Sequence, residues 1–347
     1  MSKNIKVLVI DDSALVREIL SDGLSRDSGL DVVGTAVDPY SARDKIIELQ
    51  PDVLTLDVEM PKMNGVEFLR KLMPQYPLPV VMVSALTSKG AQITLDALEA
   101  GAIDFVAKPK SDIARGLNAM LMELCVKIKI ASTVNVAHWK HKKTEIFPSK
   151  APQNDLKETT DKIIVIGAST GGTEAIKKVL SRFPVSTPGV VIVQHMPEKF
   201  TASFSARLNT KCYMEVKEAE DGDRVIAGRV LISPGNKHME VYKSGGTYKV
   251  RLSAGEIVCG HRPSVEVLMH SVAECAGINS VGVMLTGMGE DGSGGMLAMR
   301  KKGARTFAQD EKTSVVFGMP KRAYEKGGVE LLLPLDKISD TVLEIFR

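Results

Sequence analysis

Short apolar runs alternate with longer amphipathic segments at both ends of the chain. Four of these runs are rich in Val, Ile and Leu and have the length of buried strands: residues 7–10, 53–56, 163–166 and 190–193. Segments with helical spacing follow them. Strands that alternate with helices form βαβ units, so the pattern predicts an α/β fold of two domains, each built on a mostly parallel sheet.

This alternation stops in the middle of the chain. The middle segment is polar, contains Lys, His and Pro, and has no sustained period, which is typical of a linker. The predicted domains are therefore residues 1–125 and 161–347, joined by a linker at 126–160. The HWKHKK run at 138–143 could bind a metal or an anion, but its composition favours a solvated tether.

Composition and charge exclude several classes of protein. With 347 residues the chain is long enough for two domains that each bury a core. Its 45 basic and 42 acidic residues leave a net charge of +3, too small to indicate a nucleic-acid-binding surface. Four widely spaced cysteines indicate reduced thiols, and two aspartates interrupt the N-terminal apolar run, which argues against a signal peptide or membrane span. We expect a cytoplasmic monomer.

Four predicted strands of the first domain end in polar residues. These residues are Asp11 and Asp12, Asp57, Ser84, and Lys108. Ligands of an open parallel sheet bind beyond the carboxyl ends of its strands, so these side chains should meet in one crevice. Three carboxylates there need a counter-charge, and their oxygens suit Mg²⁺. The lysine and the serine hydroxyl would bind the oxygens of a phosphoryl group. Turn formation explains one such aspartate, but hardly the whole set.

On these residues the first domain resembles the receiver domains of two-component response regulators. The resemblance implies a flavodoxin-like fold with five strands. It also implies that Asp57 accepts a phosphoryl group and forms a Mg²⁺ site with Asp11 and Asp12. A sensor histidine kinase would supply the phosphoryl group. The residues that would respond to phosphorylation are Ser84, Phe105 and Lys108.

A glycine-rich turn follows the first strand of the second domain, in the sequence VIGASTGG. Gly167, Ser169 and Gly171 fit the G-x-S-x-G pattern of a nucleophile elbow, which lifts a serine above a sheet. The same glycines could instead bind the pyrophosphate of a dinucleotide at a helix N-terminus. The turn by itself leaves both interpretations open.

The next two strand ends favour the nucleophile. A dinucleotide site would place Asp or Glu at the end of the second strand, where this sequence has His195. A third strand runs into a glycine-rich turn that contains Asp291. If the strands are neighbours, His195 could take a proton from Ser169. The chain order Ser, His, Asp differs from that of α/β-hydrolases, chymotrypsin and subtilisin, but triads are defined by geometry rather than by order.

A second function stays open on these residues alone. Each of the three could be an ordinary turn or surface residue. The second domain could also bind a nucleotide or DNA without hydrolysing anything. DNA binding is disfavoured because the domain has no helix-turn-helix pattern and no basic stripe. Nucleotide binding is disfavoured by the missing acid at the second strand end.

Four motifs of the second domain resemble the catalytic domain of the chemotaxis protein-glutamate methylesterases: GASTGG, QHMP, GHRPSVEVLMHSVA and TGMGEDG. The resemblance implies a phosphorylation-activated hydrolase that demethylates methyl-glutamate residues of chemoreceptors and also deamidates receptor glutamines. Ser169 would attack the ester, His195 would act as the base, and Asp291 would hold the imidazole. Thr170 and Met288 match the positions of the oxyanion hole. The esterase reaction is expected to need no cofactor.

The GHRPS segment matches a part of the family that flanks the active site. For its residues His261, Arg262 and Ser264, a functional role and a role in loop structure are equally good interpretations. Chemoreceptors are the expected substrate partners, and neither nucleic-acid binding nor membrane insertion is expected. We further expect the receiver to restrain the catalytic domain until Asp57 is phosphorylated.

Overall fold

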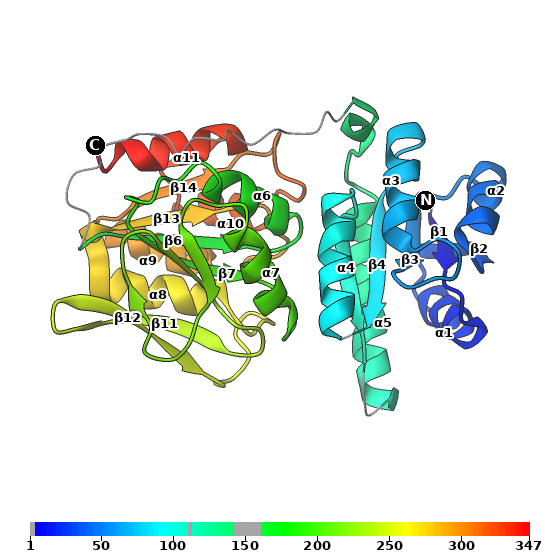
Figure 1. Ribbon diagram of the computed structural model, residues 1–347, viewed down its shortest axis with the longest axis horizontal. Helices are drawn as coiled ribbons and strands as arrows, with labels where there is room; N and C mark the ends of the chain where they lie inside the picture. Colours follow the sequence, from blue (N-terminus) through cyan, green and yellow to red (C-terminus); the bar gives the residue numbers. More distant parts are fainter. Residues whose placement is uncertain (1–3, 86, 110–112, 142–160) are drawn as a thin grey trace. The chain divides into compact units, whose positions relative to one another are not determined.

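The computed structural model describes residues 4–85, 87–109, 113–141 and 161–347 (Figure 1). The chain divides into two compact units, Met1–Glu145 and Ile146–Arg347. Each unit contains a parallel sheet whose strands alternate with helices, so the predicted α/β fold class is confirmed. In the described parts of the chain, no helix is both long enough and apolar enough to span a membrane.

The first unit contains a five-stranded parallel sheet with the flavodoxin-like order β2-β1-β3-β4-β5. Its strands are β1 (Ile5–Ile10), β2 (Leu30–Ala36), β3 (Val53–Asp57), β4 (Val80–Ala85) and β5 (Asp104–Lys108). Every residue of the central strand β3 is buried, as expected for a strand covered by helices on both faces. Because the strands are parallel, the polar residues predicted at their ends lie at the same edge of the sheet.

Five helices connect or follow these strands. They are α1 (Ala14–Ser25), α2 (Pro39–Leu49), α3 (Gly65–Gln75), α4 (Ser88–Glu99) and α5 (Ile113–Ala131). The first four begin at a polar side chain that accepts a backbone N–H of the first turn, which replaces a hydrogen bond the helix cannot make internally. These N-cap residues are Ser13, Asp38, Asn64 and Thr87.

The first unit extends further along the chain than the predicted domain boundary at residue 125. α5 continues to Ala131, inside the range 126–160 predicted to be linker, and Ile128 and Ala131 are fully buried. A short 3₁₀ helix, η1 (Ala137–His141), follows, and Trp139 lies against Gly101 of the same unit. The polar composition of this stretch hid the few apolar residues that attach it to the first unit. The rest of the predicted linker, including the end of the HWKHKK run, lies outside the described residues.

The second unit contains a seven-stranded parallel sheet with the order β15-β14-β13-β6-β7-β10-β8. Its strands are β6 (Ile163–Ala168), β7 (Gly189–Gln194), β8 (Glu215–Glu218), β10 (Arg229–Ile232), β13 (Ser280–Met284), β14 (Arg305–Gln309) and β15 (Leu331–Leu333). β6 pairs with β7 on one side and with β13 on the other. The three strands predicted to precede the serine, the histidine and the aspartate are therefore neighbours.

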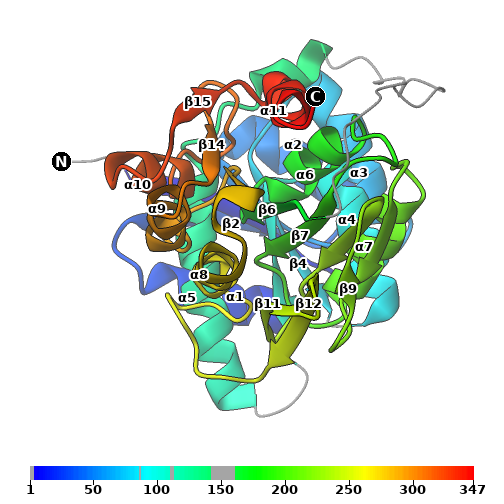
Figure 2. The ribbon, with the colours of Figure 1, turned by 90° about the vertical axis from the view of Figure 1, so that its left-hand side faces the viewer.

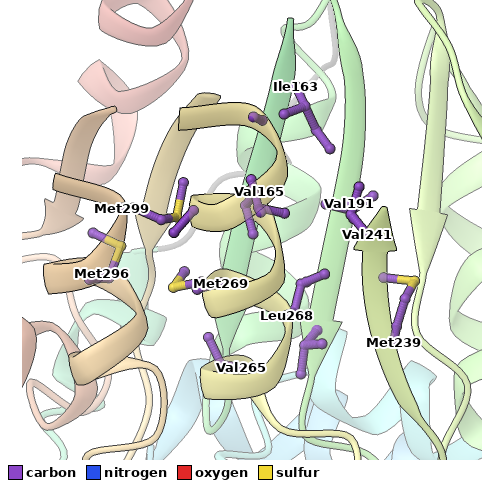
Figure 3. Close-up of a cluster of buried hydrophobic side chains, with 14 of the residues drawn as sticks. Ile163, Val165, Val191, Met239, Val241, Val265, Leu268, Met269, Met296 and Met299 are labelled. Carbon is purple, nitrogen blue, oxygen red and sulfur yellow. The ribbon is translucent and has the colours of Figure 1, made fainter. Parts of the chain in front are cut away.

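Six α-helices surround this sheet: α6 (Gly172–Leu180), α7 (Phe200–Asn209), α8 (Val265–Ala276), α9 (Ser293–Lys301), α10 (Met319–Glu325) and α11 (Leu335–Glu344). α6 packs against α11, and α8 packs against α9. In Figure 2, α8 lies between α9 and the strand β11 (His238–Ser244). Figure 3 shows the core on this face, where Val165 and Val191 of the sheet face Leu268 and Met269 of α8. This packing holds α8 against the strand ends that carry the candidate site.

A three-stranded antiparallel sheet in the second unit was not predicted from the sequence. Its order is β11-β12-β9, and its strands are β9 (Arg224–Val225), β11 (His238–Ser244) and β12 (Thr247–Ser253). β11 packs against α8, and Met239 and Val241 are buried in the same core. The doubly wound parallel sheet is therefore only part of the second unit. The small sheet fixes α8 from the side opposite to α9.

Candidate active site and phosphoacceptor site

Ser169 lies in a tight turn between β6 and α6. Its N–H donates to the carbonyl of Thr286 at 3.0 Å, and the N–H of Gly172 donates to the carbonyl of Ser169 at 2.7 Å. Gly171 has a φ of 77°, in the left-handed region that favours glycine. A Cβ atom on Gly171 would also lie 2.6 Å from the Cβ of Val315. The glycine of the elbow pattern is thus required by the backbone of the turn itself.

Two buried side chains fix the turn from either side. Gln194 Nε2 donates to the carbonyl of Ser169 at 2.9 Å and to that of His195 at 3.2 Å. Thr286 Oγ1 donates to the carbonyl of Thr170 at 3.0 Å. The turn that carries Ser169 is therefore hydrogen-bonded to the end of β7 through Gln194 and to the segment after β13 through Thr286.

His195 follows β7, and Asp291 lies in the turn that precedes α9. The distance from His195 Nε2 to Asp291 Oδ2 is 2.7 Å. The two side chains are only 6% and 1% exposed. A hydrogen bond between an imidazole and a carboxylate is stronger in such a buried place than in water. The structure thus brings two of the three predicted catalytic residues into direct contact.

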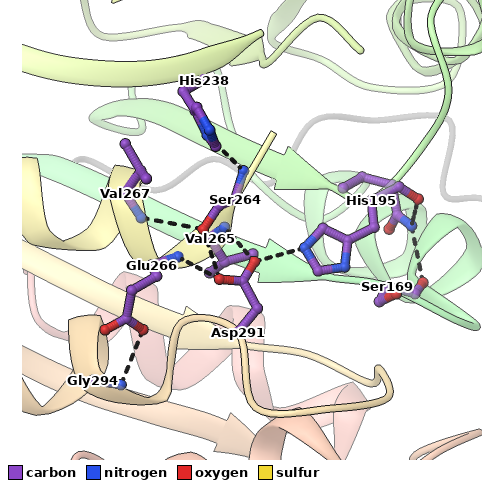
Figure 4. A network of polar contacts seen from close by, with 10 residues as sticks. Ser169, His195, His238, Ser264, Val265, Glu266, Val267, Asp291 and Gly294 are labelled. Atoms are coloured by element: carbon purple, nitrogen blue, oxygen red, sulfur yellow. Dashed lines mark hydrogen bonds and ion pairs between the residues drawn. The ribbon is translucent and has the colours of Figure 1, made fainter. Parts of the chain in front are cut away.

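The carboxylate of Asp291 also accepts three hydrogen bonds from the start of α8 (Figure 4). The donors are Ser264 Oγ at 2.7 Å, the Val265 N–H at 2.7 Å and the Glu266 N–H at 3.0 Å. Burial alone would raise the pKa of Asp291, but the hydrogen bonds from His195, Ser264 and Val265 lower this pKa below its ordinary value. Asp291 is therefore ionised at neutral pH.

The orientation of His195 leaves Nδ1 for the serine. Nδ1 is buried and has no hydrogen-bond partner among the described residues, and Ser169 lies on the other side of the ring from Asp291 (Figure 4). When Nε2 carries the hydrogen that is donated to Asp291, Nδ1 has a lone pair that can accept a proton. Chymotrypsin uses the two nitrogens in the opposite sense. The described contacts include no hydrogen bond from the Ser169 hydroxyl to His195, and such contacts often tighten only with substrate bound.

The GHRPS segment contributes three different contacts. The ring of His261 stacks on that of His195, with 3.6 Å between ring centroids and 15° between ring planes. The guanidinium of Arg262 donates to the carbonyl of Gly255 at 2.6 Å and to Asn236 Oδ1 at 2.7 Å, so it closes the loop that carries His261. Together with the bond from Ser264 to Asp291, these contacts place the whole segment around the His195 and Asp291 pair.

The two residues predicted for the oxyanion hole, Thr170 and Met288, lie next to groups that form or contact the Ser169 turn. Thr170 is the residue after Ser169 and is buried. Met288 is exposed and follows Gly287, where a Cβ atom would lie 2.8 Å from the Cβ of Ser169. α6 begins three residues after Ser169, so the positive end of the helix dipole is close by. An oxyanion hole formed by the two predicted residues stays a prediction.

The three predicted acids of the first unit form a compact cluster. One carboxylate oxygen from each of Asp11, Asp12 and Asp57 lies within 4.8 Å of the others. Lys108 Nζ is 2.9 Å from Asp11 Oδ2 and 2.7 Å from Asp57 Oδ1. Asp11 and Asp57 are buried, whereas Asp12 is exposed. Carboxylate oxygens at this spacing fit the donor set that Mg²⁺ takes in proteins.

Burial and neighbouring charges shift the pKa values of two residues of the cluster, Asp57 and Lys108. Burial and the charge of Asp11 raise the pKa of Asp57 to about 6, although Lys108 opposes the rise. Burial alone would lower the pKa of Lys108, but Asp57 and Asp11 raise it above its ordinary value. The two shifts have different main causes: burial raises the pKa of Asp57, whereas the charges of Asp57 and Asp11 raise the pKa of Lys108. A divalent cation would offset the charge of the carboxylates.

Ser84 and Phe105 contact helices rather than the acids. The hydroxyl of Ser84 accepts a hydrogen bond from Thr94 Oγ1 of α4 at 2.7 Å. The ring of Phe105 is buried, and Lys127 of α5 lies 5.4 Å from its centroid. Lys127 Nζ also donates to the carbonyl of Phe105 at 2.6 Å. The two predicted switch residues thus join the edge of the sheet that carries the acid cluster to α4 and α5.

Sequence reasoning missed four residues that support these sites. They are Thr94, Lys127, Gln194 and Thr286. Gln194 and Thr286 belong to the QHMP and TGMGEDG motifs, so their position beside predicted site residues was a usable signal. Thr94 and Lys127 lie within helices and bind groups that are distant in sequence. Only the folded chain shows that they contact the switch residues.

Comparisons with known proteins agree on both units. The family described as CheB methylesterase matches residues 164–342, and the family described as response regulator receiver domain matches residues 7–118. A protein-glutamate methylesterase/protein-glutamine glutaminase of Syntrophotalea carbinolica is 64% identical over 99% of this chain and 98% of its own. A protein of the same description from Salmonella typhimurium is 52% identical over 99% of this chain and 97% of its own.

A solved structure supports the fold of the second unit. The crystal structure of the Thermotoga maritima CheB methylesterase catalytic domain is 38% identical to this chain. It covers 53% of this chain, and 98% of that domain is covered in return, with a TM-score of 0.52. The second unit thus has the fold of a known catalytic domain.

Proposed function

This chain belongs to the CheB methylesterase family and carries a response regulator receiver domain, and on that premise we propose that it is a phosphorylation-controlled protein-glutamate methylesterase and protein-glutamine glutaminase. Its substrates are methylated glutamate side chains of chemotaxis receptors. The reaction is the hydrolysis of a carboxylic ester, which releases methanol and restores the glutamate.

In the first half of the reaction, Ser169 Oγ attacks the carbonyl carbon of the ester while His195 Nδ1 takes the hydroxyl proton. Asp291 holds the imidazole through Nε2 and stabilises the positive charge that the ring gains. The negative charge on the ester oxygen is stabilised by donors about 3 Å away. We propose Thr170 and Met288 as its donors, with the N-terminal end of α6, which begins three residues after Ser169, adding to the stabilisation.

In the second half, His195 returns its proton to the departing methanol, which leaves an acyl-enzyme on Ser169. Water then attacks this acyl group, and His195 again takes and returns a proton. A glutamine side chain follows the same path with ammonia as the leaving group. One serine site therefore accounts for both activities that the names of the relatives give.

One observation carries this proposal. The buried pair of His195 and Asp291 turns an unpartnered Nδ1 toward the strand end that bears Ser169. A structural histidine in such a place would use both ring nitrogens, since a buried polar atom without a partner is costly. A base that waits for the proton of a nucleophile leaves one nitrogen open.

For the first unit, we propose that Asp57 is the phosphoacceptor and that Asp11, Asp12 and Asp57 hold Mg²⁺. The ion, when bound, shields the charge of the carboxylates and of the incoming phosphoryl oxygens. Lys108 can move from its ion pairs with Asp11 and Asp57 to an oxygen of the phosphoryl group. Ser84 and Phe105 then transmit the change to α4 and α5, which they contact. The phosphodonor is a sensor histidine kinase of the chemotaxis pathway.

The proposed reaction can be tested by covalent labelling. A fluorophosphonate should react with Ser169 of the full-length chain treated with acetyl phosphate and Mg²⁺, and peptide mapping should find the adduct there. His195→Ala should lose the label, because the serine is no longer activated. A labelled residue other than Ser169, or equal labelling of His195→Ala, would contradict the assigned mechanism.

A further inference from the structure

The start of α8 and His195 together satisfy both oxygens of the Asp291 carboxylate. Oδ1 accepts from Ser264 Oγ and from the Glu266 N–H, and Oδ2 accepts from the Val265 N–H and from His195 Nε2. Each carboxylate oxygen therefore has two donors. With four bonds in fixed directions, the carboxylate cannot rotate without breaking at least one of them.

The hydroxyl of Ser264 is oriented by this carboxylate. Ser264 is fully buried, and its O–H donates to Asp291 Oδ1 at 2.7 Å. Its oxygen also accepts the N–H of Val267 as the N-cap of α8, but that distance is 3.4 Å. The short bond to the carboxylate is the stronger of the two, since hydrogen bonds weaken with distance and strengthen with charge.

His238 continues the network behind Ser264. It begins β11 and is 3% exposed. Its Nδ1 accepts the N–H of Ser264 at 3.2 Å, and its Nε2 lies 2.7 Å from the carbonyl of Glu256, to which it donates. Only a neutral imidazole with its hydrogen on Nε2 makes both bonds. His238 therefore fixes the backbone of Ser264 and the loop that carries His261.

We propose that Ser264 and His238 are positioning residues of the esterase: they hold the Asp291 carboxylate, and through it the ring of His195, in the orientation that Ser169 requires. The chain of contacts runs from His238 to Ser264, then to Asp291 and His195, as Figure 4 shows. This inference rests on the proposed esterase reaction. It adds two residues that touch neither the ester nor the serine.

A purely structural role for Ser264 as the N-cap of α8 is the alternative. Glycine separates the two roles, because it is accepted at an N-cap at small cost but has no hydroxyl to donate. Threonine keeps the hydroxyl. Ser271 in the same helix gives a matched control: its hydroxyl accepts the N–H of Val241 at 2.9 Å and donates to the carbonyl of Leu268 at 2.7 Å. No described bond joins Ser271 to the site.

The first test measures methanol release from methylated receptor membranes by the full-length chain with acetyl phosphate and Mg²⁺. Ser264→Gly should lower kcat about 10- to 100-fold, the value of one hydrogen bond to a charged group, with KM within about twofold of wild type. Ser264→Thr should recover most of kcat, and Ser271→Ala should keep it. A Ser264→Gly protein with wild-type kcat overturns the proposal, as does an equal loss of kcat in folded Ser271→Ala.

The second test separates the effects of the two hydrogen bonds that the His238 ring makes. His238→Asn keeps an acceptor near Nδ1 for the Ser264 N–H, whereas His238→Gln keeps a donor near Nε2 for the carbonyl of Glu256. If His238 acts through Ser264, His238→Asn should retain more kcat than His238→Gln at equal thermal stability. The opposite order, or equal kcat in both, overturns the role of His238 even if one Ser264 variant does not fold.

Failure of this inference can be told apart from failure of the proposed function. If wild type and Ser169→Ala release methanol at the same rate, the esterase assignment itself is wrong. If Ser169→Ala is inactive while every Ser264 and His238 variant has wild-type kcat, the esterase stands and only the positioning roles are lost. The rate of fluorophosphonate labelling at Ser169 gives the same comparison without a receptor.

Discussion

The direction in which His195 faces decides the chemistry of the site. Its Nε2 is 2.7 Å from Asp291, so in the proposed mechanism the base is Nδ1, the atom that chymotrypsin turns toward its aspartate. The two arrangements are equivalent for proton transfer, because either nitrogen can carry the lone pair. What matters is that the carboxylate fixes the tautomer. Here three donors from the start of α8 hold the Asp291 carboxylate, and the carboxylate in turn accepts the hydrogen of His195 Nε2.

Asp291→Asn should lower kcat by about 10³- to 10⁴-fold while leaving the fold intact, because an amide can no longer hold the required tautomer. Ser169→Ala and His195→Ala should be at least as inactive. Their losses should not add, since the residues act as one unit. Methanol release by the double variant Ser169→Ala/His195→Ala should thus equal that of Ser169→Ala. If the Asp291→Asn enzyme releases methanol at the wild-type rate, the triad assignment is wrong.

The raised pKa of Asp57 gives a prediction for stability. The folded chain has a pKa of about 6 at this carboxyl, against an ordinary value of 3.8. Between these values the folded state keeps a proton that the unfolded state has lost. The protonated carboxyl therefore contributes fully below pH 3.8, and its contribution is lost as the pH rises through about 6.

Asp57→Asn removes this loss, because the amide resembles the protonated acid at every pH. Without Mg²⁺, the substitution should raise the free energy of unfolding of the first unit by about 1 to 3 kcal/mol more at pH 7.5 than at pH 4. Fluorescence of Trp139, the single Trp of the chain, reports on this unit, since it packs against Gly101. A stability difference independent of pH would show that Asp57 has an ordinary pKa.

Strand-end residues were predictable because parallel strands bring their carboxyl ends together. Asp11, Asp57 and Lys108 could be grouped before the fold was known, and the structure places them in contact. Residues such as Lys127 and His238 could not be grouped in this way. Their role depends on bonds to backbone groups, and the residue types themselves carry no signal for such bonds.

At the scale of elements, the turn after β13 and the turn after β6 approach closely enough to require glycine. A Cβ atom on Gly287 would lie 2.8 Å from the Cβ of Ser169 and 3.0 Å from its nitrogen. The two turns must therefore move apart if this position carries a side chain. Movement of about 1 Å at a nucleophile is enough to lower a rate strongly.

Gly287→Ala should for this reason lower kcat about 100-fold. The new Cβ atom would also clash with Sδ of the buried Met319, so the stability of the second unit should fall as well. Gly255→Ala is the matched control, since a Cβ atom there meets only ordinary contacts, the nearest at 3.7 Å. Steady-state methanol release and thermal unfolding distinguish the outcomes. If both variants keep the wild-type kcat, the close approach of the two turns has no part in catalysis.

The long apolar strands of the parallel sheets were predicted, whereas the hairpin of β11 and β12 was missed although its sequence carries a signal. The buried parallel strands read as continuous apolar runs, which is how strands covered on both faces look in a sequence. β11 and β12 alternate apolar and polar residues, because only one face of the small sheet meets α8. The Gly245-Gly246 turn between them is an ordinary hairpin signal.

At the scale of the whole molecule, the chain carries a receiver and an esterase that each form a compact unit. A tether keeps the effective concentration of one unit near the other high, so a weak interaction can restrain the catalytic site. Phosphorylation need change the stability of that interaction only modestly to shift the active population. This regulation predicts that the two units behave differently when separated.

Removal of residues 1 to about 150 should raise basal esterase activity above that of the unphosphorylated full-length chain. The second unit has its own core around β6, β7 and α8, so it is expected to fold alone. The measurement compares initial rates of methanol release on the same methylated membranes. A folded fragment that is no faster than the full chain means that activation comes from contacts the phosphorylated receiver makes, rather than from release of a restraint.

We propose an esterase that is centred on Ser169 and controlled through Asp57. Methanol release from methylated receptor membranes, measured with and without acetyl phosphate and Mg²⁺, tests both parts in one experiment. Wild type should release methanol and respond to the phosphodonor, Asp57→Asn should work only at the basal rate, and Ser169→Ala should release none in either condition. Methanol release by a folded Ser169→Ala protein at the wild-type rate would contradict the central claim.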